Sequence, residues 1–403
     1  MKPVVVAGHV CLDLAPAWNS EPAIDPGRLI GVGSLGMSPG GCVGNTGPAL
    51  VALGVPTQLV ADVGLDELGR ILVDLLVASG ADTTGIARVD GLATSYSIVV
   101  DFAGRDRTFW HHVGANAAFD GGGAVERIDA ALGSAAGAGS AAGAGSAAGA
   151  GSAAGAGSAA GTGGAATDPA GAPEVILHLG YPTLLPALHA DGGAGLTRLL
   201  EAARARGALV SLDMAEVDGA SDARSVDWEG LLARTLPVVD IMKASVDDLA
   251  SMMPRRAGLA PDQWAALLVD LGAAAGLVTA GRDGVYLRTG PAPRLQTAAT
   301  SLRTWSNRQL WMPTLAASVL VTTAAGDVAA AGFLAGVSAG HAPAECALLA
   351  AAAAAARISG RPIGDAYGIA AGFSPDSAAR PNQPRGWTVG HDRVYHGPHD
   401  IEA

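Results

Sequence analysis

Residues 322–327 read Thr-Thr-Ala-Ala-Gly-Asp, and the small-residue run Val-Ala-Ala-Ala-Gly-Phe-Leu-Ala-Gly follows them at 328–336. Small residues that lead into a helix can point several free backbone N–H groups at an anion, and the helix dipole adds about half a positive charge there. A carboxylate at that point is a poor neighbour for a phosphate unless it takes part in the chemistry. We therefore predict that Asp327 accepts the proton of an alcohol while nearby amides hold a phosphoryl group in transfer.

The amides in this hypothesis belong to Ala325 and Gly326, with Ala324 beside them. An ordinary aspartate pKa of about 4 leaves Asp327 ionised at neutral pH. A simpler interpretation stays open, in which Asp327 is an acidic residue that merely stabilises a helix N-terminus.

The composition sets limits on function. The chain has 403 residues, of which 49% are hydrophobic, so it can bury a large core. Its formal charge of -12 excludes a broad basic surface for nucleic acid or anionic lipid, so phosphate binding must be local. The apolar run 350–356 is too short to span a bilayer, and we expect no membrane partner.

The three cysteines, Cys11, Cys42 and Cys346, are far apart and contain no Cys-x-x-Cys pair. This odd, scattered set argues against a disulfide framework or a zinc cluster and fits a reducing compartment. We expect a cytoplasmic protein.

A six-residue unit, Ser-Ala-Ala-Gly-Ala-Gly, repeats from Ser134 onward and ends with a threonine variant. Because the tract has no large apolar side chain, we expect a flexible insertion over about 133–168. A silk-like stacked sheet is the sharper alternative.

Apolar strand-like runs alternate with helical patterns on both sides of the insertion, and this order predicts an α/β fold with a mostly parallel sheet covered on both faces. The predicted strands are 4–8, 58–63, 175–179, 208–213, 238–243 and 276–280, and the predicted helices are 67–79, 196–206, 246–253 and 262–271.

One segment breaks this alternation. Residues 94–101 and 107–112 flank Ala-Gly-Arg-Asp at 103–106, which predicts a β-hairpin that leaves the sheet. Such a hairpin suits a lid that keeps water away from a phosphoryl transfer. Strand alternation places His111 and His112 on opposite faces of it, so at most one of them points at a ligand.

Several motifs follow one another along the chain: Gly-His-Val-Cys-Leu-Asp at 8–13, Gly-Gly-Cys-Val-Gly-Asn at 40–45, Leu-Gly at 53–54, Gly-Leu-Asp-Glu-Leu-Gly at 64–69, Gly-Arg-Asp-Arg-Thr-Phe at 104–109, Gly-Ala-Asn at 114–116 and Val-Thr-Ala-Gly-Arg-Asp-Gly at 278–284. With these motifs in this order, the chain resembles the ribokinase-like (PfkB) carbohydrate kinases over nearly all of its length.

The resemblance implies a ribokinase-like kinase domain over 1–375, with a small β lid from about 13–38 and 90–114 and a tail at 376–403. Contacts to substrate hydroxyls would come from Asp13, Gly40, Gly41, Asn45 and Asn116. A carboxylate and an amide can grip neighbouring hydroxyls, and glycine lets the backbone approach a ligand. The alternative, that Asp13 and Asn45 are only turn or cap residues, stays open.

The resemblance also implies ATP and Mg²⁺ as cofactors. Nucleotide contacts would come from Lys243, Ser245, Thr279, Gly281, Gly284 and Thr323, and Asp248 would order the magnesium ion and its waters. Two local alternatives stay open: Ser245 and Asp248 can form a helix capping box, and 279–284 can be an ordinary hairpin turn.

Three positions depart from the family pattern. Ala324 replaces a glycine, and if that position needs a positive φ the alanine costs about 1 kcal/mol or more. Val321 replaces an aspartate, so potassium dependence is not carried over. Ser245 and Asp248 replace the family's asparagine and glutamate.

Two further patterns carry less weight. Residues 31–36 satisfy Gly-x-Gly-x-x-Gly but open no apolar helix, so a dinucleotide site is not expected. The tail holds His391, Asp392, His396, His399 and Asp400, which could bind a metal, but a polar, Pro/Gly-containing terminus is more often solvated.

We therefore expect an ATP-dependent kinase that transfers phosphate to an alcohol of a small polyol, most often a sugar. Phe109, Trp110 and Trp18 could stack on a base, which keeps a nucleoside kinase as an alternative. A relative that binds sugar or nucleotide without turnover is the other alternative, suggested by the departures at Ala324, Val321 and Ser245. The apolar lid residues also allow a homodimer through the lid.

Overall fold

The computed structural model describes residues 1–18, 26–27, 29–100, 108–120, 122–147, 175–296, 299, 302–315, 318–375, 384 and 386–401. Its strands are β1 (Val4–Gly8), β2 (Cys11–Pro16), β3 (Leu35–Gly40), β4 (Thr57–Gly64), β5 (Asp82–Val89), β6 (Tyr96–Val100), β7 (Thr108–His112), β8 (Ile176–Gly180), β9 (Leu209–Asp213), β10 (Ile241–Ser245), β11 (Ala275–Thr279), β12 (Val285–Thr289), β13 (Gln309–Met312), β14 (Thr388–Val389) and β15 (Tyr395–His396). Its α-helices are α1 (Gly41–Ala52), α2 (Glu67–Ala78), α3 (Gly123–Ala147), α4 (Pro186–His189), α5 (Ala194–Ala205), α6 (Trp228–Thr235), α7 (Val246–Met252), α8 (Pro261–Asp270), α9 (Ala292–Gln296), α10 (Ala325–Ala339), α11 (Pro343–Ile358) and α12 (Ala366–Gly372).

Eleven of these strands form one sheet in the order β14-β15-β13-β12-β11-β10-β9-β8-β1-β4-β5. The strands from β11 through β5 in this order pair in parallel, and β12 to β15 add an antiparallel edge. The predicted mostly parallel α/β sheet is confirmed.

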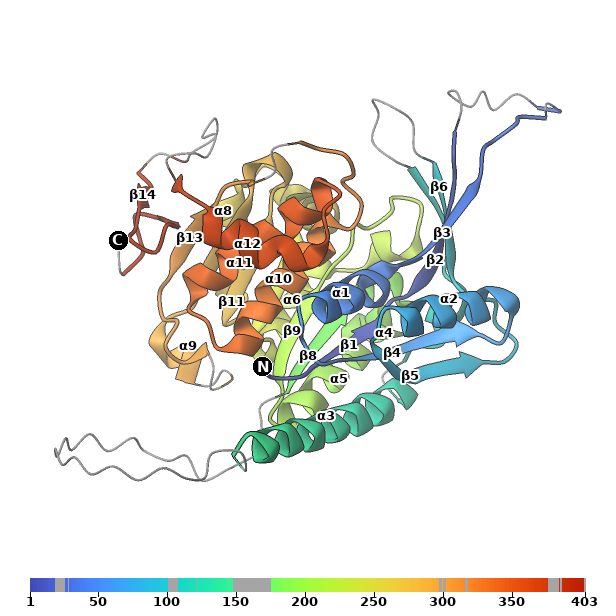
Figure 1. Cartoon of the computed structure of the whole chain (residues 1–403), viewed down its shortest axis with the longest axis horizontal. Coiled ribbons are helices and arrows are strands. Elements are labelled where there is room, and N and C mark those ends of the chain that lie inside the picture. The colour runs from blue at the N-terminus through green and yellow to red at the C-terminus, as the bar shows by residue number, and fades with distance from the viewer. Residues whose placement is uncertain are drawn as a thin grey trace.

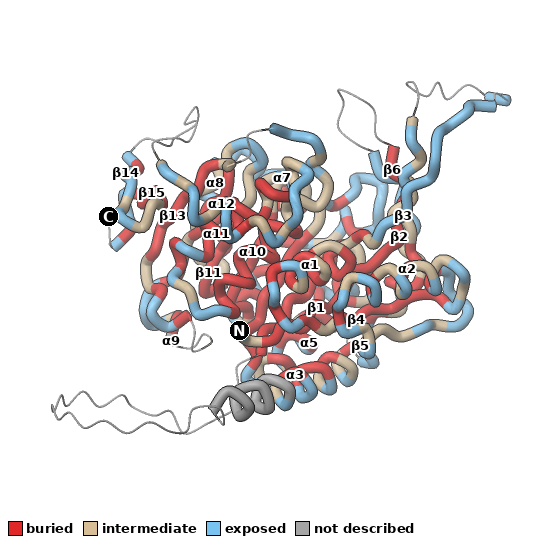
Figure 2. Tube along the Cα trace, viewed as in Figure 1, coloured by how far each residue is buried: buried red, intermediate tan, exposed pale blue. Residues whose placement is uncertain are grey.

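The central strands are buried on both faces, as Figure 2 shows. Along β1, Val4 and Val6 join one core with α1, α2, α10 and α11, whereas Val5 and Ala7 join a second core with α3, α5, α6 and α8. Because successive side chains of β1 point to opposite faces of the sheet, the strand packs against a layer of helices on each side.

A second sheet of four strands, in the order β3-β2-β6-β7, projects from the body and is called the lid here (Figure 1). Its β6 and β7 pair antiparallel, from Tyr96 opposite His112 to Val100 opposite Thr108. This confirms the two strands of the predicted hairpin, while the predicted turn at 103–106 lies outside the described residues.

Helix α3 corrects the expectation of a flexible tract from residue 133. The helix runs unbroken into the repeats as far as Ala147, and Leu132 and Ala135 are buried. Alanine is the best helix former, so the repeats prolong a helix whose earlier turns pack on α5. The rest of the insertion, 148–168, lies outside the described residues, and so does any test of the silk-like alternative there.

The C-terminal tail is also more ordered than expected. β15 pairs with β13, and the ring of Tyr395 lies 4.8 Å from that of Trp311. The prediction of a solvated tail is therefore wrong for β15, because the tail supplies apolar rings that cover the last strands. Its acidic and histidine side chains bind each other and Arg308: His396 Nε2 lies 2.9 Å from Asp392 Oδ1, and Arg308 Nε donates to Asp400 over 3.1 Å.

Helices α10 and α11 pack unusually close because small residues line their contact. A Cβ atom added to Gly332 would lie 2.5 Å from the carbonyl oxygen of Leu349, and one added to Gly336 would lie 2.8 Å from Cys346 Sγ. Any larger side chain there would push the helices apart, so the two backbones touch directly.

Within the described ranges, no helix has both the length and the apolar character needed to cross a membrane.

Candidate active site

The carboxylate of Asp327 lies near the start of α10 and is 4% exposed. Asn45 of α1 donates from Nδ2 to its Oδ2 over 2.9 Å, and Tyr181, which follows β8, donates from its hydroxyl to Oδ1 over 2.5 Å. Three segments far apart in the sequence therefore fix this carboxylate. Each of its oxygens keeps a lone pair for a further partner.

The environment of Asp327 changes its acidity. Burial raises the pKa of the carboxyl group above its ordinary value, and the charge of Lys243 and the hydrogen bonds from Tyr181 and Asn45 only partly oppose this. The expectation of an ordinary pKa is thus corrected. A raised pKa makes Asp327 a stronger base than an exposed aspartate once it is ionised.

Ala324 caps α10 with a left-handed backbone, at φ +61° and ψ 12°. This is the condition under which an alanine costs about 1 kcal/mol or more relative to glycine. The N–H of Ala325 donates to the carbonyl of Thr322 over 3.2 Å, so this amide closes the turn, and its contact with an anion stays a prediction. Helix geometry leaves the amides of Gly326 and Asp327 without intrahelical acceptors.

A buried ion pair lies directly against this turn. Lys243 of β10 places Nζ 2.9 Å from Asp213, which ends the neighbouring β9, and a Cβ on Gly326 would lie 3.3 Å from that Nζ. Burial alone would lower the pKa of Lys243, but the attraction of Asp213, Asp248 and Asp327 outweighs it and raises the pKa. The ammonium group therefore stays charged next to the start of α10.

The lid contributes Asp13, on β2 opposite Ser38 of β3. A Cβ on Gly40 would lie 2.4 Å from Asp13 Oδ2, and one on Gly41, at φ +75°, would lie 2.4 Å from His9 Nδ1. The diglycine thus makes room for these two side chains. Burial raises the pKa of Asp13, and the charge of Asp327 raises it further.

Residues 187–363 match the model of the pfkB family carbohydrate kinases. The ribokinase of Arabidopsis thaliana, solved with ribose and ATP, is 18% identical with a TM-score of 0.60, and the match covers 93% of this chain and 99% of that one. A protein of E. coli solved with ATP and Mg²⁺ is 16% identical, with a TM-score of 0.61 and coverage of 92% and 98%.

A nucleoside kinase of Methanocaldococcus jannaschii, an archaeal ribokinase relative, is 16% identical with a TM-score of 0.57 over 93% of this chain and 99% of that one. The match to the family model covers less than half of the chain, and the solved structures share its fold. Both agree with the resemblance to ribokinase-like (PfkB) kinases drawn from the ordered motifs, and the ribokinase-like fold is confirmed.

The side chain of Asn116, which we predicted to contact the substrate, binds the backbone of Val10. It is fully buried, its Nδ2 donates to the carbonyl of Val10 over 2.9 Å, and its Oδ1 accepts from the Val10 N–H over 3.3 Å. Both ends of the amide hold the connection between β1 and β2. Asn116 therefore positions the segment from His9 to Cys11, and its contact with a substrate stays a prediction.

The predicted nucleotide residues lie at one edge of the sheet, since Ser245 of β10 is the register partner of Thr279 of β11. The local alternatives are both observed. Ser245 and Asp248 form a reciprocal capping box at α7, with the Ser245 N–H donating to Asp248 Oδ2 over 2.7 Å. Residues 279–284 form the turn of the antiparallel β11–β12 pair, with Gly281 and Gly284 at positive φ.

Thr323 lies in the turn before α10, and its carbonyl accepts from Arg357 Nε over 2.9 Å. The cap and turn roles leave nucleotide binding at Ser245, Thr279 and Thr323 as a prediction.

Sequence reasoning missed Tyr181 and Asp213. Each stands at the carboxyl end of a strand that the sequence did predict, and in parallel sheets these ends meet at one edge where ligands bind. Their position at the ends of predicted strands was the signal by which the sequence could have identified Tyr181 and Asp213. Tyr181 also has a left-handed backbone, at φ +63°, a strain that concentrates at functional sites.

The two lid histidines lie on opposite faces of the lid, as strand alternation predicts. His111 lies 3.1 Å from Ser97 and 3.3 Å from His9, on the face of the lid that carries Asp13, whereas the ring of His112 lies 5.3 Å from that of Tyr96.

Proposed function

We propose that the protein is an ATP-dependent kinase that phosphorylates an alcohol group of a sugar or similar small polyol, with Asp327 as the catalytic base. The observation that carries this proposal is the carboxylate of Asp327, buried near the start of α10 and fixed between Asn45 and Tyr181. A bare helix cap needs no such fixation. A general base needs it, because its oxygen must face one hydroxyl.

In the proposed reaction, the substrate oxygen forms a bond to the γ-phosphorus of ATP as the bond to the leaving ADP oxygen breaks, and the hydroxyl proton passes to Asp327. The amides of Gly326 and Asp327 and the ammonium of Lys243 stabilise the charge on the phosphoryl oxygens. Tyr181 and Asn45 keep the carboxylate aligned during the transfer.

The acceptor would be gripped from the lid side by Asp13, with Asn45 near the base. Asp13 and Asp327 influence each other electrostatically, and two carboxylates at one site favour an uncharged polyol over a phosphorylated one. The ribose seen in the Arabidopsis ribokinase structure fits that class.

ATP and Mg²⁺ are proposed as cofactors on chemical grounds. Ser245 and Thr279 supply hydroxyls where β10 and β11 end side by side, Thr323 lies in the turn before α10, and Asp248 has oxygen ligands of the kind Mg²⁺ prefers. Magnesium, when bound, neutralises phosphate charge during transfer.

A nucleoside acceptor is the second candidate, and one observation favours it. Phe109 lies two residues before His111 on β7, so alternation places its ring on the face of the lid that carries Asp13. An aromatic ring there can stack on a nucleobase. Trp110 lies on the opposite face, which removes it from this role.

The proposal is tested by incubating the full-length protein with Mg²⁺ and ATP against a panel of sugars and nucleosides. We expect turnover of at least one member, and a loss of about 10²–10⁴-fold in kcat for Asp327→Asn with substrate binding retained. Asp247→Asn, at an exposed position in α7, is the matched control and should keep full activity.

Binding of panel members without any turnover would contradict the kinase proposal and favour the non-catalytic alternative. Full activity of Asp327→Asn would contradict the role of Asp327.

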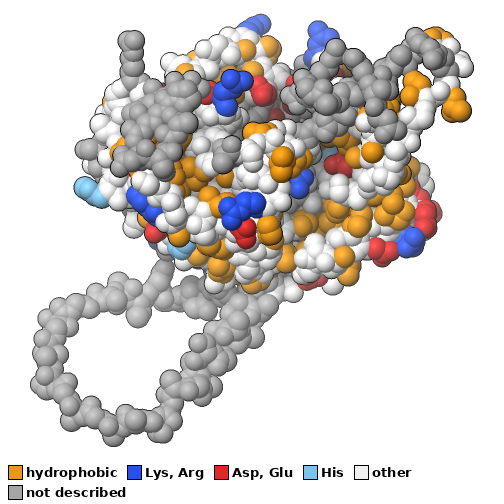
Figure 3. Space-filling model, turned by 45° about the horizontal axis from the view of Figure 1, so that its top comes forward, with side chains coloured by type: hydrophobic (Ala, Val, Ile, Leu, Met, Phe, Trp, Pro, Cys, Tyr) orange, Lys and Arg blue, Asp and Glu red, His pale blue; other side chains and the backbone are white. Residues whose placement is uncertain are grey.

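We also propose that the lid forms a homodimer. On β3, Leu35 and Met37 are 53% and 44% exposed, and Trp110 on β7 is 51% exposed. Figure 3 shows apolar side chains on the projecting part of the molecule at the upper right. The double variant Met37→Glu/Trp110→Glu should convert a dimer to a monomer in light scattering; a monomeric wild type would contradict the proposal.

The cysteines Cys11, Cys42 and Cys346 are all buried and free of disulfides. This supports the proposed cytoplasmic location, where thiols stay reduced.

A further inference from the structure

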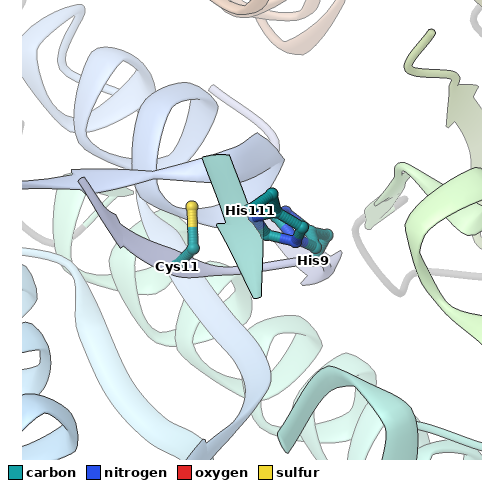
Figure 4. Close-up of side chains that lie close together, drawn as sticks. All are labelled: His9, Cys11 and His111. Atoms are coloured by element: carbon teal, nitrogen blue, oxygen red, sulfur yellow. The ribbon is translucent and has the colours of Figure 1, made fainter. Parts of the chain in front are cut away.

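Two imidazoles and a thiol meet at the base of the lid, beside the Asp327 site. His9 follows β1, Cys11 begins β2, and His111 lies on β7 (Figure 4). The Nε2 atoms of His9 and His111 are 3.3 Å apart, and one ligand atom from each of the three residues lies within 4.8 Å of the others.

The spacing suits a tetrahedral cation. Zinc binds histidine nitrogen at roughly 2.0–2.1 Å and cysteine sulfur at about 2.3 Å, so a tetrahedral ion needs about 3.3 Å between two nitrogens and about 3.6 Å between nitrogen and sulfur. The two nitrogens already meet this requirement. The thiol of Cys11 needs a shift of about 1.2 Å at most, which rotation of its side chain can provide.

Both imidazoles can offer a lone pair, because burial and the neighbouring His111 lower the pKa of His9, and burial and His112 lower the pKa of His111. Burial raises the pKa of the Cys11 thiol, so a metal has to displace the proton that this thiol donates to Asp13 Oδ1. The ring of His111 is fixed through Nδ1, 3.1 Å from Ser97 Oγ, as metal-bound imidazoles are commonly fixed through their second nitrogen.

His9 is poorly satisfied as it stands. The ring is 2% exposed, its Nδ1 has no hydrogen-bond partner among the described residues, and its Nε2 faces another imidazole nitrogen. One of the two facing Nε2 atoms donates its proton to the other, which leaves the buried Nδ1 of His9 as the unpartnered atom; a cation between the two Nε2 atoms would replace that shared proton.

We propose that His9, Cys11 and His111 bind a thiophilic divalent cation, best fitted by Zn²⁺, with one coordination position left open. Two imidazoles and a thiolate form a donor set that zinc favours and magnesium does not. His9 belongs to the body and His111 to the lid, so the ion would join the two beside Asp13, whose Oδ1 lies 3.4 Å from the Cys11 sulfur.

The experiment uses the full-length protein without ATP, freed of metal by a chelator and titrated with Zn²⁺ alone and with Co²⁺ alone. We expect one Zn²⁺ per chain, and a sulfur-to-cobalt charge-transfer band that disappears in Cys11→Ser. His111→Ala should weaken Zn²⁺ binding at least tenfold.

The matched control is His112→Ala, the next residue on the opposite face of β7, which should bind Zn²⁺ like the wild type. His111→Ala changes a residue of the exposed strand β7, so it tests the site even if the buried Cys11 variant does not fold. Absence of binding to the wild type would overturn the proposal, and so would equal affinity in the His111→Ala and His112→Ala variants, which would place the ion elsewhere, such as the tail histidines. Because no kinase substrate is present, neither result bears on the kinase proposal.

Discussion

The hydroxyl of Tyr181 donates a 2.5 Å hydrogen bond to Oδ1 of Asp327. Burial and the charge of Asp327 raise the pKa of the Tyr181 phenol well above its ordinary value, so the tyrosine stays protonated and acts as the donor. The bond stabilises the ionised carboxylate and lowers its pKa relative to a site without the tyrosine.

The first prediction concerns the pH profile of Tyr181→Phe. Asp327 accepts a proton only when ionised, so activity is present above its pKa and is lost as the pH falls through it. Because the substitution removes a bond that lowers this pKa, the acid limb of kcat/KM should move to higher pH. Tyr367→Phe, which loses a remote hydrogen bond to the Leu53 carbonyl, should leave the limb in place. If the acid limb of kcat/KM stayed at the same pH in Tyr181→Phe, the hydrogen bond from Tyr181 would not set the pKa of Asp327.

The second prediction concerns Ala324→Gly. Glycine relieves the left-handed strain at this cap, worth roughly 1–2 kcal/mol, but its larger entropy in the unfolded state takes back roughly 0.5–1 kcal/mol. We expect the free energy of unfolding in urea to rise by up to about 1 kcal/mol. Ala329→Gly, within the same helix, should instead lower it by roughly 0.5–1 kcal/mol. A loss of stability in both variants would contradict the strain at Ala324.

The third prediction separates structure from chemistry at the Lys243–Asp213 pair. Lys243→Met leaves the Asp213 carboxylate buried without its cation and should destabilise the protein by roughly 3–5 kcal/mol. Adding Asp213→Asn to that variant should restore much of the stability in urea unfolding. Activity should stay reduced by about 10²-fold or more, because the ammonium beside Gly326 is still missing. Recovery of activity in the double variant would show that Lys243 serves folding alone.

The fourth prediction compares two ion pairs. The pair of Arg308 with Asp400 is buried, whereas that of Arg256 with Glu229 is exposed. Asp400→Ala should cost roughly 3–5 kcal/mol, because it strips a buried guanidinium of its carboxylate. Glu229→Ala should cost roughly 1 kcal/mol or less. If Asp400→Ala and Glu229→Ala lost similar amounts of stability in thermal unfolding, the tail would not stabilise the sheet.

Much of the fold followed from local patterns. β1 begins and ends where its apolar run does, and β4, β8, β9 and β11 lie within two residues of their predicted bounds, because strands buried on both faces read as continuous apolar runs. β10 starts three residues late, since Pro237 lies in the 3-10 turn at 236–238 that precedes it.

The site was only partly predictable for a related reason. Asp327, Asn45 and Asp13 stand in motifs of small and polar residues, which the sequence displays. Tyr181, Asp213 and the His9–His111 pair depend on which strand ends come together in space. The order of strands in the sheet supplies that information, and local periodicity does not.

The small-residue contact between α10 and α11 has a mechanical consequence. The main chains of α10 and α11 are in direct contact, so the two helices cannot slide past each other unless Gly332 separates from Leu349. Asp327 in α10 is therefore held rigidly. Any motion that assembles the site around its ligands therefore falls to the lid, while the part of the molecule that contains α10 and α11 stays in place.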